Sequence, residues 1–492
     1  MSKLRSNMIY QSMYQVLAVC IPLITSPYLS RVIGAKGLGI YSYNYSIVSY
    51  FMLFAILGVS TYGMRAIAQS RGKEEISKTF LSIFSFQIFS SLVSLVAYIA
   101  FILIFVKDRV GLTVSFIHVF YLLGEIVNIN WLFFGLEKYK TTVIRNIIIK
   151  FVTVLSIFLF VREEKDVINY IFILAFCNFM SNAVLWFKVK ECITKVKISY
   201  KDITKHIKPN ILLFLPALAA SVYHIMDKTM LGMFSDAENS GYYYNADKLL
   251  NIPLTVVVAC SNVFMSRISS LVKDGEYEQI DKTQNESIFL GMCLMSAVAF
   301  GVCAVAKEFV PWFFGKGFEP CIELIKYFAI IILVKTISTH TRSAFLIPEG
   351  NDKTYAKAII YGAMVNLVAN YILIAVYKLG ALGATLGTLI AETVVVFTQI
   401  IFMKERTSRK KCIIGIVRSF VYILMGFVML IIVTNINLGN AGRLVAIVVK
   451  ICIGATIYFA ECMLVWKLKK ELMPDMIAET IASIKKRIIN KR

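Results

Sequence analysis

The chain has 492 residues, of which 58% are hydrophobic and only 17% are charged, and its formal net charge is +22. A mean hydropathy of +0.71 excludes an ordinary soluble globular protein and predicts a membrane protein. The positive charge needs no nucleic acid to explain it, because Lys and Arg orient membrane helices and attract anionic lipid headgroups. We find no basic module with interleaved aromatic residues of the kind that binds RNA or DNA.

Apolar stretches long enough to cross a bilayer follow one another almost from end to end, with short charged loops between them. One span needs about 20 consecutive apolar residues. We therefore predict an all-α membrane protein with about 14 transmembrane helices. The predicted spans are 8–33, 38–64, 79–106, 111–134, 142–161, 167–187, 209–234, 240–266, 286–306, 320–346, 355–377, 381–403, 412–434 and 441–466.

The distribution of Lys and Arg predicts the orientation of these spans. With the N-terminus placed in the cytoplasm, far more Lys and Arg fall in or beside the inner loops than in the outer loops. Both termini are therefore predicted to be cytoplasmic. The first segment is too long for a signal peptide and contains Pro22 and Pro27, so we predict that it is a retained first span.

The ten cysteines are scattered, form no CxxC pair and do not cluster with the four histidines. This spacing is unlike that of a metal site or a disulfide framework. No cofactor is expected apart from a coupling proton or sodium ion.

Two weak internal repeats divide the spans. Residues 28–74 align without a gap with 230–276, and the segment 131–138 resembles 346–353. The shared Gly-x-Tyr opens the second span of each half and a shared Arg closes it. We therefore predict two parallel six-helix lobes around a central cavity, plus two extra helices. The pairs in the longer repeat are Leu29 with Leu231, Ala35 with Ala237, Gly39 with Gly241, Tyr41 with Tyr243, Arg65 with Arg267 and Glu74 with Glu276.

These patterns predict five parts of the chain. They are an N-terminal lobe at 1–187, a basic cytoplasmic linker at 188–208, a C-terminal lobe at 209–403, helices 13 and 14 at 404–466, and a basic amphipathic tail at 467–492. In the tail, isoleucines recur at helical spacing from Ile477 to Ile488 beside several cations. This helix is expected to lie flat on the inner leaflet, and contact with a partner protein is the alternative.

Two segments resemble a known family. Residues 27–41 (PYLSRVIGAKGLGIY), together with Asn7 and Pro22, are similar to the opening of bacterial polysaccharide flippases, and so is 134–140 (FGLEKYK) after the fourth span. The family is the Wzx or O-antigen type within the multidrug/oligosaccharidyl-lipid/polysaccharide exporter superfamily. The resemblance extends over essentially the whole chain, and it implies alternating access with a lateral gate for a lipid tail and a hydrated cavity for its headgroup.

The same resemblance implies a function without catalytic residues. Such proteins move undecaprenyl-diphosphate-linked oligosaccharide units across the bacterial cytoplasmic membrane for O-antigen, capsule or exopolysaccharide synthesis. The expected partners are the lipid-linked oligosaccharide and membrane lipids, and also a polymerase and glycosyltransferases that act in the same biosynthesis. The carrier itself is expected to be a monomer.

Ionisable residues inside spans are functional candidates, because each is costly to place at membrane depth. The densest group is Asp227 and Lys228 on the seventh span with Asp247 and Lys248 on the eighth. The two lysines are candidates to bind the diphosphate, and the two acids are candidates for ion coupling. Alternatively, the four residues form a self-neutralising group of ion pairs that holds two helices together.

Three arginines at the inner ends of spans are further headgroup candidates. Arg65, Arg267 and Arg342 can each grip a phosphate with a planar guanidinium, or can simply anchor the helix ends.

Three titratable residues within spans complete the set of ion-coupling candidates. The second repeat aligns Glu125 with His340, which would place an acid and a base in one cavity. Glu392 lies in the middle of the twelfth span. It is either an ion-coupling residue or a structural residue whose carboxylate has a partner within the helix bundle.

The competing functions are a lipid II flippase, a cation-coupled multidrug antiporter of the same superfamily and, from a different class, a membrane-embedded polysaccharide polymerase. A drug antiporter would favour acids in its cavity, whereas Lys and Arg are prominent among these candidates. A polymerase usually needs a large outer loop, and the longest outer segment here, 306–320, is short. No Walker-type phosphate loop is present, so ATP hydrolysis on this chain is not expected.

Overall fold

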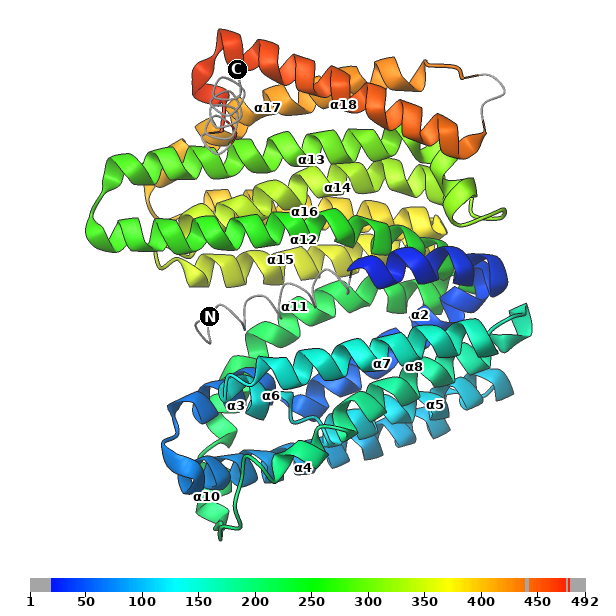
Figure 1. Ribbon diagram of the computed structural model, residues 1–492, viewed down its shortest axis with the longest axis vertical. Helices are drawn as coiled ribbons and strands as arrows, with labels where there is room; N and C mark the ends of the chain where they lie inside the picture. The colour runs from blue at the N-terminus through cyan, green and yellow to red at the C-terminus, as the bar shows by residue number, and fades with distance from the viewer. Residues whose placement is uncertain (1–18, 439–441, 475–476, 478–492) are drawn as a thin grey trace, which may run out of the picture. The chain divides into compact units, whose positions relative to one another are not determined.

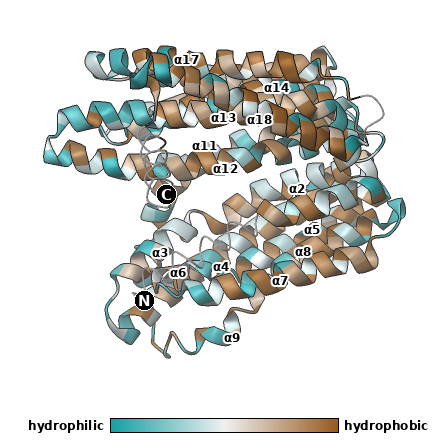
Figure 2. Ribbon diagram, turned by 45° about the horizontal axis from the view of Figure 1, so that its top comes forward, coloured by the Kyte–Doolittle hydropathy of each residue, from teal (hydrophilic) through white to brown (hydrophobic). Residues whose placement is uncertain are grey.

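A computed structural model describes residues 19–438, 442–474 and 477. Within these ranges the chain is almost entirely helical and no strand occurs, which confirms the predicted all-α fold (Figure 1). Helices suit a lipid environment because they satisfy their backbone hydrogen bonds within one segment. Most of the long helices are apolar along their length, and hydrophilic residues gather at their ends and in the loops (Figure 2).

Eleven helical segments in the described ranges are long and apolar enough to cross a membrane. They coincide with eleven of the predicted spans. Two other predicted spans, 209–234 and 320–346, are also helical in the described ranges but are not among these eleven segments. The first predicted span lies partly outside the described residues, so the count of fourteen stays a prediction.

The chain forms two compact units, Met1–Gly241 and Tyr242–Arg492. A helix at 19–32 precedes the labelled elements of the first unit. These elements are α2 (Gly34–Ile56), α3 (Val59–Gln69), α4 (Gly72–Phe105), α5 (Arg109–Ile126), α6 (Asn130–Gly135), α7 (Tyr139–Phe160), the 3₁₀ turn η1 (Glu164–Asp166), α8 (Val167–Ala183), α9 (Trp186–Val189), α10 (Tyr200–Thr204) and α11 (Ile207–Phe234).

The second unit begins within α12 (Ala237–Asp274). In it α13 packs against α14, α17 and α18, while α16 packs against α14 and α15. The remaining elements are α13 (Tyr277–Phe313), α14 (Pro320–Thr341), the π-helix η2 (Arg342–Leu346), α15 (Asp352–Asn370), the π-helix η3 (Tyr371–Val376), α16 (Gly380–Ile401), α17 (Arg406–Thr434), α18 (Arg443–Leu468) and the 3₁₀ turn η4 (Lys470–Leu472).

Several predicted spans are interrupted helices. Between α2 and α3, Leu57 and Gly58 both adopt positive φ values, of 39° and 79°. A Cβ atom on Gly58 would lie 2.6 Å from the Asn210 carbonyl oxygen, so glycine suits both the backbone conformation and the close approach of α11.

The compact units do not end where the predicted lobes end. Helix α11 packs against α2 and α3, and the first unit extends to Gly241. The predicted lobe boundaries around the 188–208 linker stay a prediction. The predicted amphipathic tail lies outside the described residues from 478 onward.

Candidate functional site

The fourth predicted span, 111–134, is broken between α5 and α6 at membrane depth. Side chains from other helices bind the carbonyl oxygens that the break releases. Gln87 Nε2 donates to the carbonyls of Glu125 and Asn128, at 2.7 and 2.8 Å, and Trp186 Nε1 donates to the carbonyl of Val127 at 2.9 Å. Irregular backbone survives inside a membrane where such partners exist, so this break is part of the fold.

A buried polar network runs from this break to a buried arginine. The carboxylate of Glu125 accepts a hydrogen bond from Asn128 Nδ2 at 2.9 Å, and Asn128 Oδ1 accepts one from Asn130 Nδ2 at 2.7 Å. Arg145 donates to Asn130 Oδ1 and, at 2.7 Å, to Ser181 Oγ. Two neutral amides therefore link a buried carboxylate to a buried guanidinium, and charges so placed are common at functional sites.

Arg145 is the residue of this network that the sequence did not single out. It lies near the start of α7, at the inner end of the predicted span 142–161, where a cation is typical of an orienting residue, yet its side chain is buried. The signal that points to it is the group of polar residues at similar depth, Asn130, Ser181 and Asn182. Asn182 both accepts from Asn130 and donates to the carbonyl of Gly124.

In the second unit, Glu392 has a partner. Lys335 Nζ on α14 lies 3.2 Å from Glu392 Oε1 on α16, and the two side chains are 17% and 7% exposed. Nearby on the same two helices, Gln399 Nε2 donates to Ser338 Oγ at 3.1 Å. The sequence left Glu392 without an assigned partner, because the rotation of each helix decides which side chains face one another.

His340 is on α14 and contacts α13. It is 3% exposed, its Nδ1 lies 3.2 Å from Ser287 Oγ, and its ring contacts Phe345 edge-on. Glu125 belongs to the first unit and His340 to the second, so a shared cavity for the two stays a prediction.

An apolar groove of about 530 Å³ lies along α13, α17 and α18. Its walls are aliphatic, aromatic and small residues, including Leu294, Ala297, Ala455 and Phe459. A groove of this composition suits a hydrocarbon chain, because apolar walls make up most of a lipid-binding site.

One ion pair lies at this groove. Lys450 Nζ is 2.6 Å from Glu308 Oε1, and their side chains are 7% and 24% exposed. Lys450 is buried against α13, where the carboxylate of Glu308 neutralises its charge.

The other headgroup candidates have different environments. Arg65 in α3 and Arg267 in α12 are exposed. Arg342 is half-buried with its guanidinium 5.7 Å from the centre of the Tyr355 ring. Phosphate binding by these three arginines stays a prediction.

The group predicted on the seventh and eighth spans is divided between the units. Asp227 is buried and Lys228 is half-buried on α11, in the first unit. Asp247 accepts a hydrogen bond from Asn251, and Lys248 lies over the Tyr244 ring at 5.0 Å, in the second unit. Crosswise pairing between the two helices stays a prediction.

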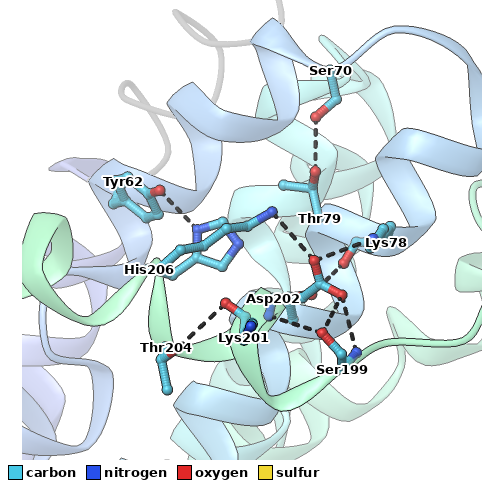
Figure 3. A network of polar contacts seen from close by, with 11 residues as sticks. Tyr62, Ser70, Lys78, Thr79, Ser199, Lys201, Asp202, Thr204 and His206 are labelled. Carbon is cyan, nitrogen blue, oxygen red and sulfur yellow. Dashed lines mark hydrogen bonds and ion pairs between the residues drawn. The ribbon is translucent and has the colours of Figure 1, made fainter.

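Within the first unit, the basic linker is docked on α3 and α4 (Figure 3). Lys78 Nζ lies 3.1 Å from Asp202 Oδ1, and Tyr62 Oη lies 2.7 Å from His206 Nδ1. Next to Lys78 on α4, Ser77 Oγ accepts a hydrogen bond from the backbone N–H of Thr194 at 2.8 Å. The linker is thus held at several points by α3 and α4.

Docking of the linker lowers the pKa of two residues outside the spans, His206 and Asp202. Burial, and then the charge of Lys205, lower the pKa of His206 to about 4 from its ordinary value near 6.5. Hydrogen bonds from Ser199 and Lys78 lower the pKa of Asp202 to about 2. Both groups therefore dock in the state that dominates at neutral pH, a neutral imidazole and a charged carboxylate.

Acid is expected to loosen the linker. Because the pKa of docked His206 is depressed, its contribution to docking is complete above about pH 6.5 and is lost as the pH falls toward about 4. Hydrogen–deuterium exchange of 194–206, corrected for intrinsic rates, should be faster at pH 5 than at pH 7. The variant His206→Gln should remove most of this difference, and an equal difference in that variant would contradict the assignment to His206.

The comparisons with known proteins match this architecture. A family model described as polysaccharide biosynthesis protein matches residues 4–272. The chain belongs to this family.

Two curated relatives, both provisionally named O-antigen transporters, are similar to most of the chain. The protein from Shigella dysenteriae is 25% identical over 380 residues, which are 76% of this chain and 93% of the relative. The protein from Escherichia coli K12 is 21% identical over 408 residues, 82% of this chain and 97% of the relative.

Solved structures show the same fold. The lipid II flippase MurJ in an inward closed conformation matches with a TM-score of 0.72 and 14% identity, over 94% of this chain and 99% of that one. An inward-facing multidrug resistance MATE transporter matches with a TM-score of 0.60 and 12% identity, over 85% and 95%. The fold is therefore that of the MurJ and MATE transporters.

Proposed function

We propose that this protein is a flippase that moves polyprenyl-diphosphate-linked oligosaccharide units across the bacterial cytoplasmic membrane for surface polysaccharide synthesis. The family and the two relatives support this class of substrate. The observation that carries it furthest is the apolar groove on α13, α17 and α18, which fits a polyisoprenoid chain and would be of little use to a fully polar solute.

The embedded charges support a substrate with an anionic headgroup. Lys228, Lys248 and Lys335 are half-buried cations on helices of the predicted C-terminal lobe. Their ammonium groups are point charges that suit a diphosphate. In this account Arg65, Arg267 and Arg342 assist at the cytoplasmic ends of the spans. Transport changes no covalent bond, so the protein is proposed to be a carrier and not an enzyme.

Ion coupling is proposed to use the network around Glu125. Its carboxylate is buried, and only neutral amides lie in the chain of hydrogen bonds between it and Arg145. Loss of the negative charge at Glu125, by protonation or by substitution, would therefore change the hydrogen bonds at the α5–α6 break directly. Asp227, Asp247, His340 and Glu392 remain secondary candidates, with a proton or sodium ion as the coupling species.

Depletion of the protein in its own cell tests the proposed function. Lipid-linked oligosaccharide units should accumulate on the inner leaflet while surface glycan falls, and the wild-type gene should reverse both effects. Undiminished surface glycan in a depleted strain that has no second flippase would contradict the proposal. The proposed orientation, with both termini cytoplasmic, is checked by protease protection of terminal tags.

A further inference from the structure

The first residues of α12 cross α2 with their backbones in direct contact. A Cβ atom on Gly39 would lie 1.7 Å from the Ala237 carbonyl oxygen, and a Cβ atom on Gly241 would lie 1.9 Å from the Ala35 carbonyl oxygen. No side chain fits at either glycine without moving a helix. All four residues belong to the first compact unit.

The internal repeat relates the two sides of this contact to each other. The alignment of 28–74 with 230–276 equates Ala35 with Ala237 and Gly39 with Gly241. The contact of Gly39 with Ala237 is therefore equivalent, by the repeat, to the contact of Gly241 with Ala35. A contact that maps onto itself when its two sides are exchanged is isologous, which is the geometry of a two-fold interface.

The contact continues along α2 onto the end of α11. A Cβ atom on Gly232 would lie 1.9 Å from Cδ2 of Tyr43, so the tyrosine ring packs directly on the helix backbone. About one turn further along α2, Thr229 Oγ1 lies 2.9 Å from Ser46 Oγ. One face of α2 thus receives the α11–α12 turn over several helical turns.

We propose that this crossing is the outer seal of the transporter, closed in this structure. The proposal rests on the proposed flippase function and orientation, which place the α11–α12 turn at the outer face and the two sides of the crossing in different lobes. Backbone contact through glycines leaves no room for an oligosaccharide headgroup. It separates without the loss of backbone hydrogen bonds, so it suits a contact that opens once per cycle.

A disulfide across the crossing tests whether it must open. In the variant Ser46→Cys/Thr229→Cys, copper phenanthroline should join the two helices in membrane vesicles, as detected by mass spectrometry of the linked peptides. Cross-linked protein should lose at least tenfold of its flipping or export activity, and reductant should restore it. The single variants Ser46→Cys and Thr229→Cys, treated alike, control for the native cysteines. Full activity in cross-linked protein would overturn the seal.

Alanine at the glycines tests why the crossing closes. Gly39→Ala or Gly241→Ala, in the double-cysteine background, should lower the cross-linking yield at least threefold at equal membrane abundance. The matched control is Gly301→Ala in α13, since a Cβ atom there meets nothing within 4 Å. An unchanged yield in the glycine variants would refute the role of the backbone contact. Because cross-linking needs no substrate, this result stands apart from any failure of the proposed function.

Discussion

The variant Lys335→Ala is expected to lower the stability of the folded protein strongly. It leaves Glu392, only 7% exposed, without its cation at 3.2 Å. Removing one partner of a buried ion pair typically costs about 3–5 kcal/mol, and the partial exposure of Lys335 places the effect at about the lower end. Thermal denaturation of the purified protein in lipid nanodiscs should show a clear fall in Tm.

Two control variants separate this effect from a general loss of charge. The double variant Lys335→Met/Glu392→Gln should recover most of the lost stability, because no charge is then left buried alone. The variant Lys411→Ala breaks a pair of nearly the same kind, with Asp281 at 2.6 Å, but both side chains are 43% exposed. Exposed pairs contribute about 0–1 kcal/mol, so its Tm should barely move. Equal Tm values for Lys335→Ala and wild type would refute the assignment.

The double variant also separates structure from transport. If Lys335 attracts the diphosphate, Lys335→Met/Glu392→Gln should be stable and still export poorly. Export at the wild-type level from this variant would show that the pair only holds α14 to α16.

Filling the apolar groove is expected to abolish export while leaving the protein folded. The residues Ala297 on α13 and Ala455 on α18 both line the groove. Phenylalanine at either position would place an aromatic ring where a hydrocarbon chain is proposed to lie. We expect export to fall at least tenfold, measured as surface glycan in a depleted strain, with Tm close to that of wild type.

A lipid-facing position next to the groove provides the matched control. Cys452 on α18 is exposed and does not line the groove, so Cys452→Phe should export normally. Normal export by both groove variants would remove the groove from the mechanism. Equal loss of export in Cys452→Phe would mean that bulk anywhere on α18 is harmful.

The helices and the family could be predicted from the sequence because both depend on local patterns. Apolar run length determines where helices cross a membrane, and the residues around Gly34 and Gly135 carry the family resemblance. The repeat was also informative beyond its low identity, since Gly39 and Gly241 meet in the structure.

The partners of buried charges could not be predicted in the same way. Whether Lys335 faces Glu392, or Lys450 faces Glu308, depends on how each helix is rotated and packed, and apolar composition does not record that rotation. Arg145 was missed because an arginine near a helix end resembles an orienting cation until its partners are known. The docking of the linker likewise depends on pairs far apart in sequence, such as Lys78 with Asp202.

The most direct measurement of the central claim is flipping in a defined membrane. Purified protein in proteoliposomes should move a fluorescent polyprenyl-diphosphate oligosaccharide from one leaflet to the other, as followed by protection from a membrane-impermeant reagent. The rate should fall at least tenfold in Ala455→Phe and stay near wild type in Cys452→Phe. No flipping above protein-free vesicles, by wild-type protein shown to be folded and oriented, would contradict the account.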